Sequence, residues 1–190
     1  MAGTPARMHI FRMRSNIVNM QTRKVIVLPY NSEWKTEFQS IKAELDELLG
    51  DLIVGIEHVG STSVEGMSAK PCIDIDIIIN DYSVFADVKD KLEGIGYIHE
   101  GDLGIKDREA FGYKNKPHLM NHHLYVCPQC SEELHRHITF RNFLRSNPDA
   151  VKKYSKVKKK AAQLYPCDIE GYIEYKSPCI EEFYNECGLK

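Results

Sequence analysis

The sequence lacks the long apolar run, the signal peptide and the strong net charge that would mark a membrane, secreted or nucleic-acid-coating protein. Its longest apolar stretch, near Ile73–Ile79, is interrupted by two aspartates and is too short to cross a membrane. No signal-peptide pattern is present. The formal net charge of the 190 residues is only −2, which gives no argument for bulk affinity to nucleic acid. We therefore expect a cytoplasmic protein without membrane contact.

Cysteine is present but scattered, and the chain has no spacing that suggests a disulfide framework; the six residues are Cys72, Cys127, Cys130, Cys167, Cys179 and Cys187. Without a secretory signal we expect reduced thiols. Cys127 and Cys130 form a C-x-x-C pair followed by His135 and His137, which resembles a zinc site. Residues two apart on a helix point about 200° away from each other, so we do not expect these histidines to complete one.

The length fits one domain, and we predict that residues 24–190 form it, with a helical part from about residue 131. Residues 1–23 differ from the rest, because no acidic residue precedes Glu33 and four arginines fall there: Arg7, Arg12, Arg14 and Arg23. A transit peptide or an upstream extension would explain this composition. We expect poor order in this N-terminal extension.

Apolar spacing and turn residues predict the order of the elements. We expect strands at Val25–Leu28, Leu52–Val59, Ile73–Ile79, from Tyr97, at Phe111–Tyr113 and at His122–Val126. Helices are expected from Ser32 to Gly50, from the Gly60–Ser63 turn to about Lys70, at Ser83–Glu93, at Ser131–Arg145, from Pro148, and from Asp168 with a break near Ser177–Pro178. The single tryptophan, Trp34, lies on the apolar side of the first helix and is expected in the core.

The first chemical motif is Gly60-Ser61-Thr62-Ser63, which follows an apolar run. A strand that turns into a helix N-terminus presents free backbone N–H groups to an anion such as phosphate. Gly60 would let the backbone approach the ligand, and the hydroxyls of Ser61, Thr62 and Ser63 would add hydrogen-bond donors. The same four residues are also what an ordinary helix cap requires.

The second motif is Asp74-Ile75-Asp76, followed by three isoleucines that predict a buried strand. Alternate strand residues share a face, so Asp74 and Asp76 should project together. Adjacent carboxylates repel each other unless a cation lies between them. Their hard oxygens suit Mg²⁺ or Mn²⁺ held together with substrate phosphates. A surface pair in a salt-bridge network is the alternative.

These stretches resemble the GrpB family, which carries H-V-G-S-T-S-V-P-G and then K-P-x-I-D-I; this chain has Glu65 in place of the proline. Three later segments are also similar to family motifs: His122–Val126, Arg136–Arg145 and Tyr175–Pro178. The family looks like a branch of the nucleotidyltransferase superfamily. The resemblance implies an α+β (α/β-like) fold, with a mixed sheet flanked by helices and a helical C-terminal segment.

The resemblance also implies further site residues. Superfamily members often carry a third carboxylate near the strand His122–Val126, where this chain has none, so His123 is the predicted replacement ligand or base; a structural histidine is the alternative. Tyr125 stands where the family commonly has histidine. Lys70, Arg136, Arg141 and Lys176 are predicted to contact phosphate or nucleotide. Solvent exposure for Lys70 and ion pairs for the arginines remain open.

Three functions are compatible with this pattern. The first is metal-dependent transfer of a nucleotidyl group from an NTP to an unknown acceptor, with Asp74 and Asp76 as catalytic metal ligands. The second is a nucleotide-binding module without turnover. The third is nucleic-acid binding through the six lysines of residues 152–160, but an apolar stripe through this helix favours a solvated lysine face instead.

Overall fold

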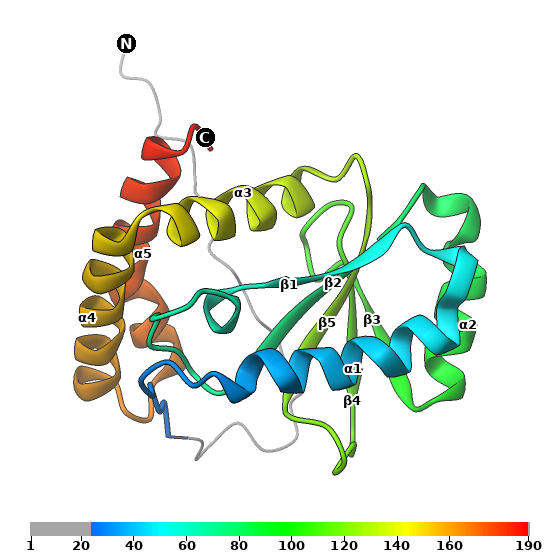
Figure 1. Ribbon diagram of the computed structural model, residues 1–190, viewed down its shortest axis with the longest axis horizontal. Helices are drawn as coiled ribbons and strands as arrows, with labels where there is room; N and C mark the ends of the chain where they lie inside the picture. Colours follow the sequence, from blue (N-terminus) through cyan, green and yellow to red (C-terminus); the bar gives the residue numbers. More distant parts are fainter. Residues whose placement is uncertain (1–23, 190) are drawn as a thin grey trace.

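A five-stranded mixed sheet forms the centre of the protein (Figure 1). The structure is a computed structural model that describes residues 24–189, so the expectation for residues 1–23 lies outside it. The strand order is β1-β2-β5-β4-β3. The strands are β1 (Gly55–Val59), β2 (Ile73–Ile79), β3 (Tyr97–Gly101), β4 (Glu109–Tyr113) and β5 (His122–Pro128). The α+β class expected from the sequence is confirmed.

The two central strands, β2 and β5, run parallel, and all other neighbours in the sheet are antiparallel. In this register Asp74 lies opposite His123 of β5, and Asp76 lies opposite Tyr125. On the other side of β2, Glu57 of β1 lies opposite Asp76. Paired residues project from the same face of a sheet, so all five side chains share one face.

The other face of the sheet carries the main apolar core. The four odd-numbered isoleucines of β2 are fully buried there: Ile73, Ile75, Ile77 and Ile79. Helices α1 (Glu33–Leu49) and α2 (Phe85–Gly94) pack on them. Trp34 is 3% exposed and belongs to this core, as expected. Alternation therefore buries the isoleucines and leaves the intervening aspartates on the opposite face.

Helices from the last third of the chain cover the acidic face of the sheet. They are α3 (Glu132–Ser146), α4 (Pro148–Leu164) and α5 (Ile169–Glu186). Leu134 of α3 packs on Tyr125 and Cys127 of β5, whereas α4 and α5 lie side by side at the left of Figure 1.

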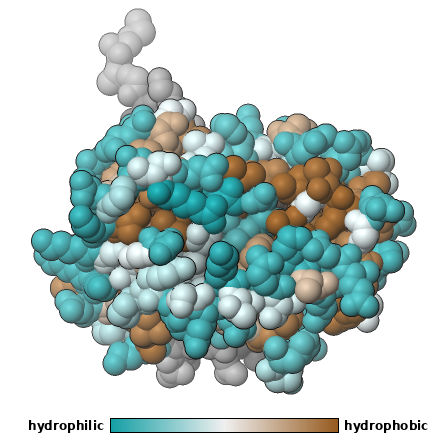
Figure 2. Space-filling view, viewed as in Figure 1, coloured by the Kyte–Doolittle hydropathy of each residue, from teal (hydrophilic) through white to brown (hydrophobic). Residues whose placement is uncertain are grey.

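On the side shown in Figure 2, hydrophilic residues cover most of the surface, and hydrophobic ones gather in a band between α3 and α1. No helix among residues 24–189 has both the length and the apolar character to cross a membrane.

Two predictions about the early part of the chain are wrong. Residues Val25–Leu28 form no named strand: Leu28 makes an isolated bridge to Ala69, and the Val25 N–H donates to the carbonyl of Pro166. The helix expected from Gly60 to Lys70 is only the single 3₁₀ turn Ser61–Ser63. Gly66, with a φ of +77°, lies in the segment that was expected to be helical, and this backbone conformation is incompatible with a helix.

Two predictions about helix ends also need correction. Helix α1 does begin after Ser32, but the Ser32 side chain makes no capping bond; the Asn31 side chain instead accepts from the Glu33 N–H at 3.0 Å. Helix α5 continues through Pro178 instead of breaking. The expected caps Ser131 and Asp168 are confirmed, since their side chains accept from the N–H groups three residues later.

Candidate functional site

The acidic pair of β2 is held by two histidines from different elements. Asp74 and Asp76 project together from the sheet, as the alternation predicts. His123 Nδ1 donates to Asp74 Oδ1 at 2.9 Å, and His137 Nδ1 of α3 donates to Asp76 Oδ2 at 2.7 Å. Burial alone would lower the pKa of each histidine, but the neighbouring carboxylate raises it to about 10. The geometry therefore pairs each carboxylate with an imidazolium.

Asp76 is the more deeply buried acid and belongs to a longer chain of charges. Its side chain is fully buried, and His137 also faces the carboxylate of Glu133, with Nε2 and Oε1 3.2 Å apart. Burial would raise the pKa of Glu133, but the nearby imidazole of His137 and the charge of Arg136 lower it. Glu133 is 2% exposed. Helix α3 therefore places a second buried carboxylate next to the imidazole that binds Asp76.

A further carboxylate lies on β1. Glu57 is opposite Asp76 in the sheet, and Arg141 of α3 forms an ion pair with it. Arg141 also donates to the carbonyl of His58 at 3.0 Å. Arg136, the other arginine predicted to bind phosphate, forms an ion pair with Glu133. Both arginines are thus engaged with carboxylates of the site in this structure, and their assignment to phosphate remains a prediction.

The Gly60–Ser63 turn presses directly on the acidic pair. Gly60 has a φ of +68°, and a Cβ atom there would lie 2.1 Å from Oδ2 of Asp74. A side chain at this position would collide with the carboxylate, so the close approach requires glycine. From its sequence context Gly60 was expected to let a ligand approach the backbone, and in the structure it also makes room for Asp74.

The three hydroxyls of the turn have different partners. Ser63 donates to the Gly60 carbonyl at 2.6 Å, and Thr62 donates to the Cys72 carbonyl while it faces the ring of His58. These two side chains hold the shape of the turn. Ser61 differs, because its oxygen accepts a hydrogen bond from Lys158 Nζ of α4 at 2.8 Å. Because the turn is not a helix N-terminus, a phosphate site here depends on Ser61 and on nearby cations.

Lys158 is a buried lysine that the sequence analysis did not single out. It is 2% exposed, and its ammonium lies 4.5 Å from the ring centroid of Tyr154. Burial and the charge of Lys176 lower its pKa well below the ordinary value. No carboxylate forms an ion pair with it among the described residues. Burial without a carboxylate partner disfavours the ammonium form of Lys158. An anion that enters from solvent would supply the missing counter-charge.

Two predicted lysines extend this positive region. Burial and the charge of Lys70 lower the pKa of Lys176 to about 8, whereas the charge of Asp74 acts in the opposite direction. Lys70 also acts on Asp74 electrostatically. Three segments far apart in the sequence thus bring Lys70, Lys158 and Lys176 together around Ser61 and Asp74. The structure therefore gathers an acidic pair and a group of lysines on either side of the turn.

The carboxylates of β2 fit a hard cation only in part. Each accepts a hydrogen bond from a histidine through one oxygen. The other oxygen of Asp76, Oδ1, is buried without a hydrogen-bond partner among the described residues. An oxygen in that state has capacity for a cation. No set of three histidine, cysteine or acidic side chains within residues 24–189 has the arrangement of a metal site. Asp74 and Asp76 would therefore hold Mg²⁺ or Mn²⁺ together with oxygens of a substrate.

The C-x-x-C pair is divided by the fold. Cys127 is buried on the acidic face, where burial raises the pKa of its thiol, whereas Cys130 is exposed. His137 is engaged with Asp76. On the same face Arg108 is 3% exposed and lies 4.4 Å from the ring centroid of Tyr125. Arg108 directly precedes β4 and was not among the residues predicted for the site.

Sequence patterns contained signals for two of the missed residues. Lys158 follows Val151 by seven residues and Tyr154 by four, so it occupies a position of the apolar stripe that a solvated lysine would avoid. His137 lies in the segment similar to the Arg136–Arg145 family motif. Glu133 lies in the first turn of α3, and only the packing of this helix on the sheet links it, through His137, to Asp76.

Comparison with solved structures defines the class of fold. The Cid1 poly(U) polymerase bound to MgGTP aligns with a TM-score of 0.52 over 73% of this chain and 46% of that chain, at 11% identity. At this identity the likeness concerns the fold alone. The chain therefore has a nucleotidyltransferase-like fold.

The particular family follows from closer relatives. The profile described as GrpB protein matches residues 24–186, and the chain belongs to the GrpB family. The conserved protein GrpB from Enterococcus faecalis aligns with a TM-score of 0.75 at 31% identity, over 85% of this chain and 96% of that chain. The glutamate-rich protein GrpB of Alkalihalophilus pseudofirmus is 31% identical over 168 residues, covering 86% of this chain and 95% of its own length.

Another relative is longer than this chain. The UPF0157 protein YqkA of Bacillus subtilis is 33% identical over 159 residues. The match covers 84% of this chain but 46% of YqkA. The chain thus spans about half the length of that relative.

Proposed function

We propose that this GrpB-family protein is a metal-dependent nucleotidyltransferase that transfers a nucleotidyl group from an NTP to an acceptor. One observation carries the proposal: Gly60 lies against the Asp74 carboxylate, and the next residue, Ser61, accepts a hydrogen bond from the buried Lys158. Two adjacent residues of the turn therefore contact a carboxylate and a buried amine, respectively. A nucleoside triphosphate with its cation requires this combination.

The roles follow from charge. Lys158, Lys176 and Lys70 would neutralise the β- and γ-phosphates, and Ser61 would donate to a phosphate oxygen once Lys158 turns its ammonium to the ligand. Asp74 and Asp76 would hold Mg²⁺ or Mn²⁺. Such a cation, when bound, neutralises charge on the phosphates and on the leaving pyrophosphate. The nucleotide-binding turn needs no helix dipole in this arrangement.

The transfer itself forms one bond and breaks one. A hydroxyl oxygen of the acceptor attacks the α-phosphorus, the bond to the β-phosphate oxygen breaks, and pyrophosphate leaves. The proton of the acceptor must pass to a base, for which His123 is the predicted residue. Bound to Asp74, a protonated His123 is a donor, so this role requires that it first lose its proton. The acceptor is unknown.

A nucleotide-binding module without turnover is the second candidate. The residues of β5 opposite Asp74 and Asp76 are His123 and Tyr125, neither of which is a carboxylate. Glu57 and Glu133 are the nearest additional acids on the acidic face, and both are engaged in ion pairs. This observation favours binding without chemistry.

Calorimetric titration of ATP, GTP, CTP and UTP, with and without Mg²⁺ or Mn²⁺, tests the proposal. We expect metal-dependent binding of at least one NTP, which an Asp74→Ala/Asp76→Ala protein loses. No binding to any NTP under either condition would overturn both candidates. Release of pyrophosphate from the bound NTP in a cell extract that supplies acceptors, absent from the double variant, would separate the enzyme from the binding module. We also propose that the protein acts in the cytoplasm.

A further inference from the structure

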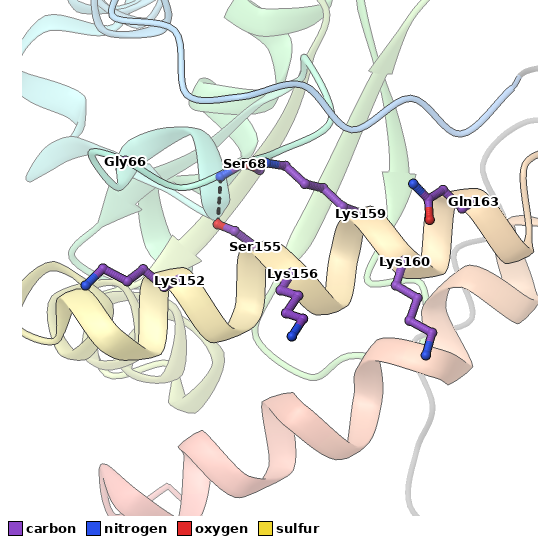
Figure 3. Close-up of a pocket in the computed structure, with 8 residues that line it drawn as sticks. All are labelled: Gly66, Ser68, Lys152, Ser155, Lys156, Lys159, Lys160 and Gln163. Atoms are coloured by element: carbon purple, nitrogen blue, oxygen red, sulfur yellow. Dashed lines mark hydrogen bonds between the residues drawn. The ribbon is translucent and has the colours of Figure 1, made fainter.

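A basic hollow lies on the outer side of α4. Its volume is about 620 Å³, and its lining residues are Gly66, Ser68, Lys152, Ser155, Lys156, Lys159, Lys160 and Gln163. Figure 3 shows the lysines leaving α4 along its length, beside the loop that carries Gly66 and Ser68. The Ser68 N–H donates to the Ser155 hydroxyl at 2.9 Å, which fixes this loop against the helix. The hollow therefore lies between α4 and a loop that is hydrogen-bonded to it.

The charges of the hollow are of one sign. No acidic residue lines it, and Lys156, Lys159 and Lys160 form no ion pair with a carboxylate among the described residues. Lys152, at one end of the hollow, pairs with Asp149 at 3.1 Å. Lys152, Lys156 and Lys160 follow one another at intervals of four. Like charges at this spacing destabilise a helix. Within residues 24–189, the unpaired ammonium groups of Lys156, Lys159 and Lys160 leave an excess of positive charge on this face, which points to an anionic ligand.

The lining also restricts the kind of anion. It has no aromatic or large apolar side chain, so it offers nothing for a base or for the acyl region of a lipid bilayer. Its cations are lysines, which act as point charges without the fixed geometry by which arginine selects one phosphate or carboxylate group. From Lys152 to Lys160 the helix rises roughly 12 Å. That distance is enough for about three successive phosphates of a strand.

We propose that the lysine-lined hollow of α4 binds the phosphate backbone of a nucleic-acid strand, without contacts to its bases and without selecting its sequence. The surface differs from the site around Asp74, because the lysine that serves that site, Lys158, points inward from the same helix. A lysine run that the sequence alone favoured as a solvated face is thus, in the fold, a concave surface of one charge. The proposal does not depend on nucleotidyl transfer.

Fluorescence polarisation with labelled RNA and DNA oligonucleotides of about 12 nucleotides tests it. The titration contains no NTP and no divalent cation, so its outcome is independent of the proposed enzyme. We expect binding at about 50 mM salt, with similar affinity for different base compositions. The logarithm of the association constant should fall with the logarithm of salt concentration with a slope of about −2, as three phosphate contacts predict for a single strand.

A matched pair of variants locates the surface. Lys156→Glu/Lys160→Glu should weaken binding by about ten-fold or more and reduce the salt slope. Lys35→Glu/Lys114→Glu changes the net charge equally at exposed positions outside the hollow, and should weaken it by less than about two-fold. If the first double variant does not fold, Lys156→Gln/Lys160→Gln replaces it.

Three results would overturn the proposal. One is no change in polarisation at the lowest salt concentration. Another is equal weakening by the two double variants, since binding would then follow net charge alone. The third is binding to vesicles containing phosphatidylserine without binding to either oligonucleotide, which would assign the surface to membranes.

Discussion

Gly60 and Asp74 are in contact across the turn that joins β1 to the 3₁₀ segment, because a Cβ atom on Gly60 would lie 2.1 Å from Oδ2 of the carboxylate. Gly60→Ala should therefore move Asp74, and the positive φ adds a strain of about 1–3 kcal/mol. We expect loss of metal-dependent NTP binding in calorimetry while the protein remains folded in circular dichroism. Gly101→Ala is the control, since Gly101 also has a positive φ but has open space around it. Equal effects of the two variants would show that backbone strain alone is responsible.

Lys158 should contribute to binding at the expense of stability. Lys158→Met keeps much of the side-chain volume but removes a buried amine that has no carboxylate partner among the described residues, so the free energy of unfolding should stay the same or rise. Loss of one charged hydrogen bond to phosphate should weaken NTP binding by roughly 10- to 100-fold. Urea unfolding and calorimetry measure the two effects. Exposed Lys160→Met should change neither, and a strongly destabilised Lys158→Met protein would contradict this role.

NTP affinity should depend on pH through Lys176. Its pKa in the free protein is about 8, because burial and the charge of Lys70 disfavour the ammonium form. Only the protonated form attracts phosphate, so affinity should be highest below pH 8 and fall as the pH rises above it. Lys176→Arg keeps its charge over this range, and its affinity should vary less. An identical pH profile for the two proteins would exclude Lys176 from the phosphate site.

Stability should decrease in acid through His122, which lies on the core side of β5. His122 Nδ1 donates to the Met120 carbonyl at 2.8 Å, and its Nε2 accepts from the Tyr97 hydroxyl at 2.7 Å. Burial lowers its pKa from 6.5 to about 4. Between these values the unfolded chain binds a proton that the folded protein does not, so the free energy of unfolding falls as the pH decreases.

Between pH 6.5 and 4, one such histidine changes the free energy of unfolding by about 1.4 kcal/mol per pH unit. His122→Gln should be less stable near neutral pH, because it loses the Tyr97 hydrogen bond, yet its stability should depend less on pH between 6.5 and 4. His58, whose pKa burial also lowers to about 4, should preserve part of the dependence. Urea unfolding at several pH values measures the pH dependence of the free energy of unfolding, and the exposed His135→Gln is the control. A slope unchanged from the unsubstituted protein would contradict the assignment.

The acidic pair and its face could be predicted from the sequence because strand alternation is a local rule. Ile73 to Ile79 bury every second side chain, so the positions of Asp74 and Asp76 follow directly. The turn after β1 could not be predicted in the same way. A stretch with serines and glycines is compatible with a helix cap or a 3₁₀ turn, and the contact of Gly60 with Asp74 depends on tertiary packing.

The remainder of the site depends on helices that pack on the sheet from far along the chain. His137 and Glu133 reach Asp76 only because α3 lies across β5. Arg136 and Arg141 have acidic partners that their spacing along the helix did not reveal. Lys158 was obscured by five neighbouring lysines, although its place in the apolar stripe distinguished it.

The inward orientation of one lysine among six has a consequence for covalent labelling and for natural variation. Amine-reactive reagents should modify the five exposed lysines of residues 152–160 readily and Lys158 slowly, so peptide mass spectrometry would find one protected amine within a reactive segment. At the five exposed positions, arginine would keep the positive charge and the contact with solvent. At Lys158 the larger guanidinium would have to fit between Tyr154 and Ser61. Among the six lysines of residues 152–160, Lys158 should therefore tolerate substitution differently from the other five.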